Sequence, residues 1–100
     1  MTKSAVSKNG VVVRLTDERW EHISEEHCEI AELQSEILLT ISDPLRIVEG
    51  HAGELLAVRE LELGKYMVVV YREVLSDGFV ITAFVTRRIR SLEKRKQVWP

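Results

Sequence analysis

The spacing of apolar residues changes near the middle of the chain, from a helical period to a strand period. Before Pro44, apolar residues recur every three or four positions, which is the period of one helix face. We predict a first helix over residues 17–27, with Thr16 as its N-cap, and a second over residues 29–41. Pro44 ends the second helix, because proline disfavours helical backbone at the residue before it.

β-branched runs separated by turn signals predict strands in the rest of the chain. Ser76-Asp77-Gly78 is typical of a hairpin turn before the last of these strands. The predicted strands cover residues 11–15, 45–48, 54–63, 65–74 and 79–87. The order β-α-α-β-β-β-β indicates an α+β fold, with two N-terminal helices packed on one face of a curved antiparallel sheet of four to five strands. The other face is then partly open and available for binding.

Length and composition indicate one domain in a reducing compartment. The chain has 100 residues and a single cysteine. We expect residues 1–10 to form a flexible lead-in, and residues 11–100 to form one domain with a basic C-terminal tail. The cysteine count, the missing signal-peptide pattern and the short apolar runs together favour a cytoplasmic protein without a membrane partner.

Charge is distributed unevenly along the chain. Residues 1–50 contain five basic and ten acidic residues, whereas residues 51–100 contain nine basic and six acidic residues. Residues 86–96 alone, TRRIRSLEKRK, contain six basic residues and one acidic residue. Such a segment attracts phosphate, although a solvated, frayed tail has the same composition.

Strand alternation gives a first candidate site. It predicts that the helices cover Ile81, Ala83 and Val85, which leaves Thr82 and Thr86 on the open face. We expect Arg59 and Tyr71 of the neighbouring strands to join these threonines. Arginine and hydroxyl groups suit a phosphate. Arg59 could instead pair with a glutamate across the sheet, and Tyr71 could lay its ring on the edge of the core with its hydroxyl in water.

Three histidines offer further chemistry. His22 and His27 are five residues apart, about 140° around one helix, whereas two metal ligands on a helix favour a spacing of four. Even with His51 as a third ligand, we expect no metal site. His27 shares the apolar stripe of the first helix and is expected to pack, while His22 lies away from that stripe.

The order of several motifs resembles the barnase–EndoU–colicin–RelE-like (BECR) nuclease superfamily, in its phage-type branch. The motifs are RLTDERWEHISEEHCEI, ISDPLRIVEG, YMVVVYREV and FVITAFVT, and the similarity extends over residues 11–99. The resemblance implies two helices on a curved sheet and a metal-independent endoribonuclease without a cofactor. It also implies RNA as the substrate and, for a toxin, a cognate antitoxin protein.

The resemblance implies roles for individual residues. His22 would be the acid or base, Arg59 the phosphate clamp, and Tyr71 and Thr82 donors that position the phosphate. The residues that would bind the substrate are His27, Thr86, Arg87 and Arg88. Two positions depart from the family pattern: Cys28 replaces a proline, and Phe84 replaces a tyrosine that could donate a hydrogen bond.

Two other classes of function fit the same pattern. A small α+β domain with a basic tail could bind RNA or a protein without turnover. An exposed, apolar sheet edge could instead pair with itself in a homodimer.

Overall fold

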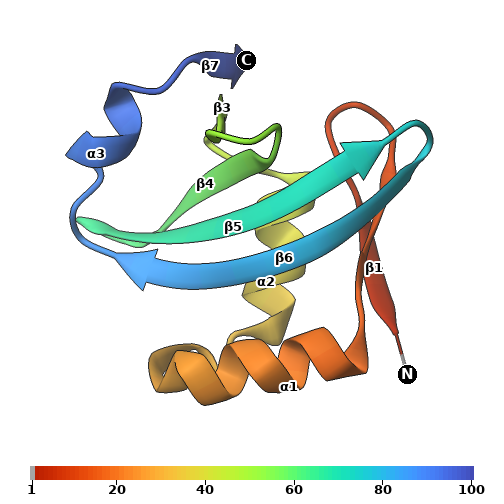
Figure 1. Cartoon of the computed structure of the whole chain (residues 1–100). Coiled ribbons are helices and arrows are strands. Elements are labelled where there is room, and N and C mark those ends of the chain that lie inside the picture. The colour runs from red at the N-terminus through yellow and green to blue at the C-terminus, as the bar shows by residue number, and fades with distance from the viewer. Residues whose placement is uncertain (1) are drawn as a thin grey trace.

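The structure is a computed structural model that describes residues 2–100, and for Cys28 it describes the backbone alone. These residues form an α+β fold with three α-helices, one 3₁₀-helix and a seven-stranded mixed sheet (Figure 1). The elements are β1 (Lys3–Val6), β2 (Val12–Leu15), α1 (Asp17–Glu26), η1 (Cys28–Ile30), α2 (Gln34–Ser42), β3 (Arg46–Glu49), β4 (Leu55–Glu62), β5 (Lys65–Val74), β6 (Asp77–Thr86), α3 (Arg90–Glu93) and β7 (Gln97–Trp99).

Both predicted N-terminal helices are present. The hydroxyl of Thr16 accepts a hydrogen bond from the backbone N–H of Arg19 at 3.1 Å, which confirms the predicted N-cap of α1. The second helix begins five residues later than predicted, because the chain first changes direction between α1 and α2. Two backbone hydrogen bonds of the tighter i→i+3 type, from Ile30 to His27 and from Leu33 to Ile30, form that bend.

The sheet is larger than the sequence predicts. Its strand order is β1-β2-β6-β5-β4-β3-β7, and every pair is antiparallel except β2 with β6. The expected flexible lead-in contains β1, and the expected basic tail contains α3 and β7. β1 was missed because residues 1–10 are mostly polar, although it forms a hairpin with the next strand, β2. β7 was missed because its partner, β3, lies about fifty residues away.

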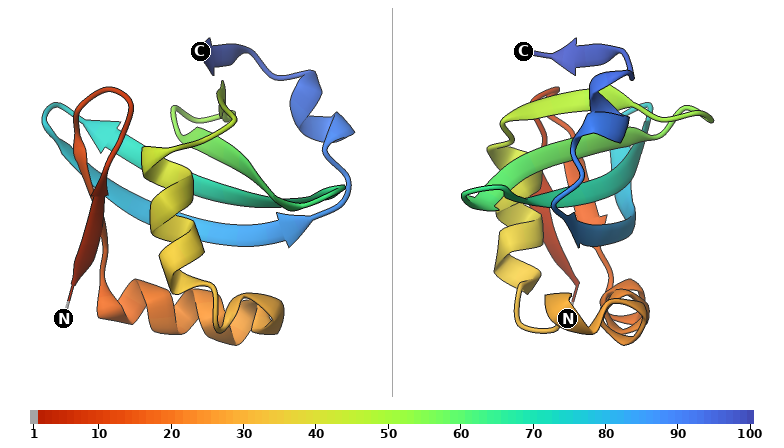
Figure 2. Two further views of the ribbon diagram at one scale, coloured as in Figure 1. Left: turned by 180° about the vertical axis from the view of Figure 1, so that it is seen from behind. Right: turned by 90° about the vertical axis from the view of Figure 1, so that its left-hand side faces the viewer.

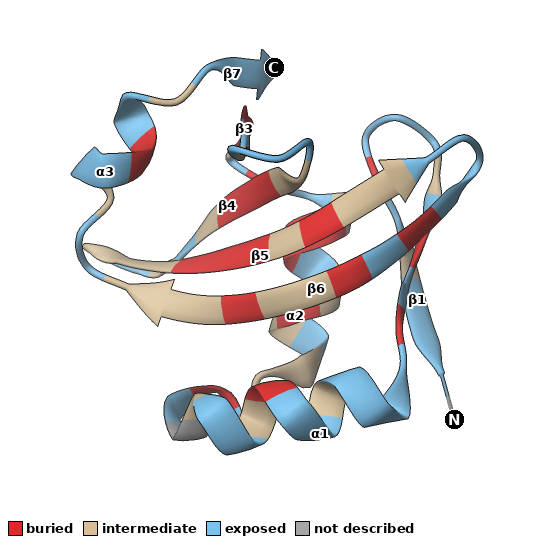
Figure 3. Cartoon of the chain, viewed as in Figure 1, coloured by how far each residue is buried: buried red, intermediate tan, exposed pale blue. Residues whose placement is uncertain are grey.

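Two hydrophobic clusters lie on opposite sides of the sheet. The larger, inner cluster lies between the sheet and the helices α1 and α2; seen from behind, α2 crosses β4, β5 and β6 while α1 lies below the sheet (Figure 2). The smaller, outer cluster lies on the other face, where Ile89 and Leu92 pack against Val48, Val58 and Val68. Buried positions therefore recur along the central strands (Figure 3).

The hairpin between β5 and β6 turns two residues earlier than the glycine signal predicts. Leu75 and Ser76 form the turn, and Gly78 lies inside β6. A Cβ atom at Gly78 would lie 3.0 Å from a methyl group of Val13. Glycine at this position therefore permits the close approach of β2 to β6, and it does not make the turn.

Candidate functional site

The pairing register assigns each strand residue to one of two faces of the sheet. Val69 lies opposite Ala83 and belongs to the inner cluster, so this set faces α2 and is called the inner face. Val68 lies opposite Phe84 and belongs to the outer cluster, so this set is called the outer face. Directly opposite residues of an antiparallel pair share a face, so the remaining residues of these strands can be assigned to the inner or the outer face.

His27 lies beside the outer face. It follows the last residue of α1, and its backbone N–H donates to the carbonyl oxygen of Ile23 at 2.9 Å. The centroid of its imidazole ring is 6.5 Å from that of Phe84, with 40° between the ring planes. The Nδ1 atom is 3.8 Å from Oε1 of Glu29, and 32% of the side chain is exposed. His27 is therefore held against the sheet and still reaches solvent.

Two threonine hydroxyls flank Phe84 on the same strand. Thr82 lies opposite Val70 and Thr86 lies opposite Tyr66, so both threonines are on the outer face. The hydroxyl of Thr86 accepts a hydrogen bond from the backbone N–H of Arg88 at 2.9 Å, which leaves its own proton free to donate. Tyr66 adds a second aromatic ring to the outer face, and its alternation with Val68 and Val70 along β5 could have indicated this position from the sequence.

The basic residues that follow β6 form a folded segment, and not a frayed tail. Residues 87–96, called the basic segment, are anchored to the outer cluster by Ile89 and by buried Leu92. Only one of its cations forms an ion pair among residues 2–100, between Nη2 of Arg87 and Oε1 of Glu62 at 3.7 Å. The six cations of the segment are Arg87, Arg88, Arg90, Lys94, Arg95 and Lys96.

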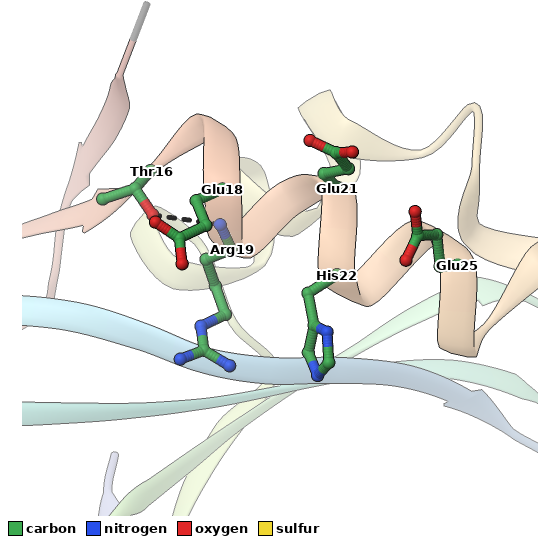
Figure 4. Close-up of a pocket in the computed structure, with 6 residues that line it drawn as sticks. All are labelled: Thr16, Glu18, Arg19, Glu21, His22 and Glu25. Atoms are coloured by element: carbon green, nitrogen blue, oxygen red, sulfur yellow. Dashed lines mark hydrogen bonds between the residues drawn. The ribbon is translucent and has the colours of Figure 1, made fainter.

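His22 lies in an acidic environment on α1. It lines a surface pocket of about 550 Å³ together with Thr16, Glu18, Arg19, Glu21 and Glu25 (Figure 4). Arg19 and His22 point to the same side of the helix. The Nε2 atom of His22 is 2.6 Å from Oε1 of Glu26, and both side chains are exposed. The surrounding carboxylates repel a phosphate, so this pocket disfavours an RNA backbone.

Arg59 belongs to the inner face and pairs with a carboxylate of α2. It lies opposite Met67, and its Nη1 atom is 2.7 Å from Oε2 of Glu36. The pair is half-buried, beside a pocket of about 350 Å³ that Glu60 and Glu62 also line. Glu36 already neutralises the guanidinium, which leaves Arg59 poorly suited to hold a phosphate.

Tyr71 is a core residue of the inner face. It lies opposite Leu55 and Val80 and has no exposed surface. Burial and the nearby charge of Glu73 raise the pKa of Tyr71 above its ordinary value of 10.0. Its hydroxyl has no hydrogen-bond partner within the described part of the chain. A substrate outside the core does not reach this group.

The expected open-face cluster of Arg59, Tyr71, Thr82 and Thr86 is therefore wrong. Arg59 and Tyr71 lie on the inner face, and the two threonines lie on the outer face. Alternation was predicted correctly for β4, for β5 and for residues 82–86 of β6, but the register between strands was not. A register shift between Val70 and Tyr71 also turns Val80 to the inner face.

Two further observations concern metals and membranes. Within residues 2–100, excepting the side chain of Cys28, no three His, Cys, Asp or Glu side chains gather in a way that could hold a metal ion. Among the same residues, no helix has the length and apolar composition to cross a bilayer.

Comparisons with known proteins found no matching family model, no matching curated protein and no matching solved structure.

Proposed function

We propose that the protein binds RNA on its outer face and cleaves it as a metal-independent endoribonuclease, with His27 as the acid–base residue. The observation that carries this proposal is the contact of His27 with Phe84, which Thr82 and Thr86 flank on the outer face of β6 and which the basic segment follows along the chain. Histidine exchanges protons near neutral pH, and hydroxyls and cations suit the charged phosphate. Aromatic rings such as Phe84 can stack bases.

The proposal reassigns roles within the pair of histidines. His22 lies among several carboxylates and is 2.6 Å from that of Glu26, whereas His27 packs against Phe84 and has a single carboxylate, that of Glu29, at 3.8 Å. The 2′-hydroxyl of RNA supplies the nucleophile, so no metal is required. Thr82 and Thr86 then donate to the phosphate, while Arg87 and Arg88 attract the RNA backbone. Membership of the BECR superfamily is part of the same proposal. Its support is the general arrangement of two N-terminal helices on a curved sheet.

The test uses a labelled RNA oligonucleotide in the presence of EDTA. His27→Asn should slow cleavage by about 100-fold or more, because general acid–base groups contribute about 10²–10⁴-fold to rates. Binding should change little. His22→Asn is the matched control, since it removes the other histidine of the WEHISEEH sequence, and it should cleave like the wild type.

A substrate with 2′-deoxyribose at each position separates binding from chemistry. It should bind without being cut, because it lacks the internal nucleophile. Equal cleavage by wild type and His27→Asn would overturn the assignment of the site. If the wild type binds RNA and cuts none, the protein is the non-catalytic binding module.

That binding module is the second candidate function, and a specific observation favours it. Cleavage needs a base for the 2′-hydroxyl and an acid for the 5′-oxygen, and His27 is a single group. The expected phosphate clamp, Arg59, and the expected donor, Tyr71, are also engaged elsewhere. A toxin role is a further extension of the proposal and predicts a cognate antitoxin. Expression of the wild type should then arrest bacterial growth, and expression of His27→Asn should not.

A further inference from the structure

An apolar patch remains exposed on the outer face at the turn end of the β5–β6 hairpin. Unlike the outer cluster, which α3 covers, this patch stays open to solvent. The register places its strand residues together: Val6 lies opposite Val12, Val12 lies beside Asp77, and Asp77 lies opposite Val74. The patch consists of Val6 (54% exposed), Val12 (48%), Val74 (51%), Leu75 (96%) and Phe79 (38%).

Leu75 at the hairpin tip has an unfavourable backbone conformation. Its φ is +58°, in the left-handed region that glycine and asparagine adopt more readily than leucine. The leucine therefore costs stability in the folded monomer and also exposes nearly its whole side chain to water. Burial of the side chain against a partner would remove the second cost, and the backbone cost that remains is of the kind that often marks functional positions.

One ion pair lies within the patch. Nη2 of Arg14 is 2.7 Å from Oδ2 of Asp77, and both side chains are about half exposed. Arg14 lies beside Phe79 in the β2–β6 pair, and Asp77 lies beside Val12. The patch therefore combines an apolar centre with one positive and one negative group. Arg72, opposite Phe79, borders the patch, and its guanidinium donates to the carbonyl oxygen of Ala52 at 2.6 Å.

We propose that this patch, which we call the hairpin patch, is the contact surface for a second copy of the chain. In a two-fold symmetric contact, the same patch is present on both sides and must complement itself. The hairpin patch meets this requirement because Arg14 of one copy can pair with Asp77 of the other. The acidic surface of α1 and the basic segment do not, because each would face its own charge across the two-fold axis.

The contact is face to face, with the outer surfaces of two hairpins stacked. From the sequence, we instead expected two copies to pair along an exposed sheet edge. Pairing along the free edge of β1 would not bury the hairpin patch, so the face-to-face contact is a different interface. Five side chains form a small interface compared with the standard size of about 800 Å² per partner. We therefore expect a weak dimer, with a dissociation constant on the order of 10–100 µM.

Sedimentation equilibrium of the whole chain tests the proposal over micromolar to near-millimolar concentrations. Leu75→Asn should weaken association by about tenfold or more, because hot-spot side chains dominate small interfaces. It should also raise the melting temperature of the monomer, because asparagine tolerates a positive φ. Leu63→Asn is the matched control: Leu63 is 91% exposed in the other tight hairpin, outside the patch, and the substitution should leave association unchanged.

Charge reversal provides an independent test of the symmetry. Arg14→Asp and Asp77→Arg should each prevent self-association, because like charges then meet across the axis. A mixture of the two variants should associate again, since both cross-axis pairs become complementary. A wild type that stays monomeric would overturn the proposal. So would a dimer that survives Leu75→Asn, equal weakening by Leu63→Asn, or a charge-reversed mixture that stays monomeric.

Discussion

Single residues acquire their roles from the face of the sheet on which they lie. Tyr71 and Tyr66 are both tyrosines of β5, yet Tyr71 is fully buried on the inner face and Tyr66 is half-buried on the outer face. The same distinction applies to the histidines, because His27 contacts Phe84 and His22 contacts Glu26. Residue type alone therefore does not identify the groups that can reach a substrate.

We predict that Tyr71→Phe leaves RNA cleavage unchanged and stabilises the protein by up to about 1 kcal/mol, because it removes a buried hydroxyl that lacks a partner within residues 2–100. Denaturant unfolding measures the change. The raised pKa adds a dependence on pH. Above pH 10.0 the unfolded chain ionises while the folded tyrosine stays protonated, so wild-type stability falls as pH rises.

The phenylalanine variant lacks this group and should lose less stability between pH 9 and 11. Cleavage that disappears in Tyr71→Phe while the fold is retained would restore a catalytic role for the hydroxyl.

At the scale of elements, ion pairs connect helices to strands. The Arg59–Glu36 pair joins β4 to α2 across the edge of the inner cluster. With about a third of each side chain exposed, the pair is neither fully solvated nor fully buried. Its contribution should therefore lie between that of a surface pair and that of a buried pair.

We predict that Arg59→Met lowers the free energy of unfolding by about 1 kcal/mol, because it leaves the carboxylate of Glu36 half-buried without its partner. Glu36→Gln should have a similar effect, and the double variant should lose less than the sum of the two. A double-mutant cycle measured by denaturant unfolding gives the coupling energy. Strictly additive losses, or an Arg59→Met variant that is fully stable but inactive on RNA, would contradict this structural role.

At the scale of the whole molecule, the loop after the first strand contacts the last strand. The loop between β1 and β2 places Nζ of Lys8 5.0 Å from the ring centroid of Trp99 in β7. Asn9 of the same loop donates to Glu73 of β5 at 2.8 Å, and Ser7 also bonds to that carboxylate. Trp99 packs against the inner cluster, so the C-terminal strand completes the core.

We predict that Trp99→Ala lowers the free energy of unfolding by about 2 kcal/mol or more, since a large aromatic side chain leaves the edge of the core. Lys8→Gln should cost about 0.5–1 kcal/mol, because it removes the cation–π contact alone. Thermal and denaturant unfolding measure both changes. Equal losses in the two variants would show that the cation, and not core packing, accounts for the contribution of Trp99.

The sequence by itself determined the local elements of this protein. The helix period, the Thr16 cap and strand alternation depend on residues a few positions apart. For this reason α1 and the strands β3 to β6 were predicted close to their observed bounds. These features depend on short-range sterics and hydrogen bonding, which a single sequence records directly. The predicted packing of His27 within the stripe of the first helix is wrong, because His27 lies beyond the last residue of α1 and contacts Phe84 of the outer cluster.

Only the tertiary structure decided which residues share a face. The register between β4, β5 and β6 separates Arg59 and Tyr71 from the threonines, and long-range pairing with β3 creates β7. It also brings His27 to Phe84, fifty-seven positions away along the chain. A shift of one residue in register moves a side chain to the opposite face at no cost to local propensity. Packing of the whole core selects among the registers, and local sequence does not record that selection.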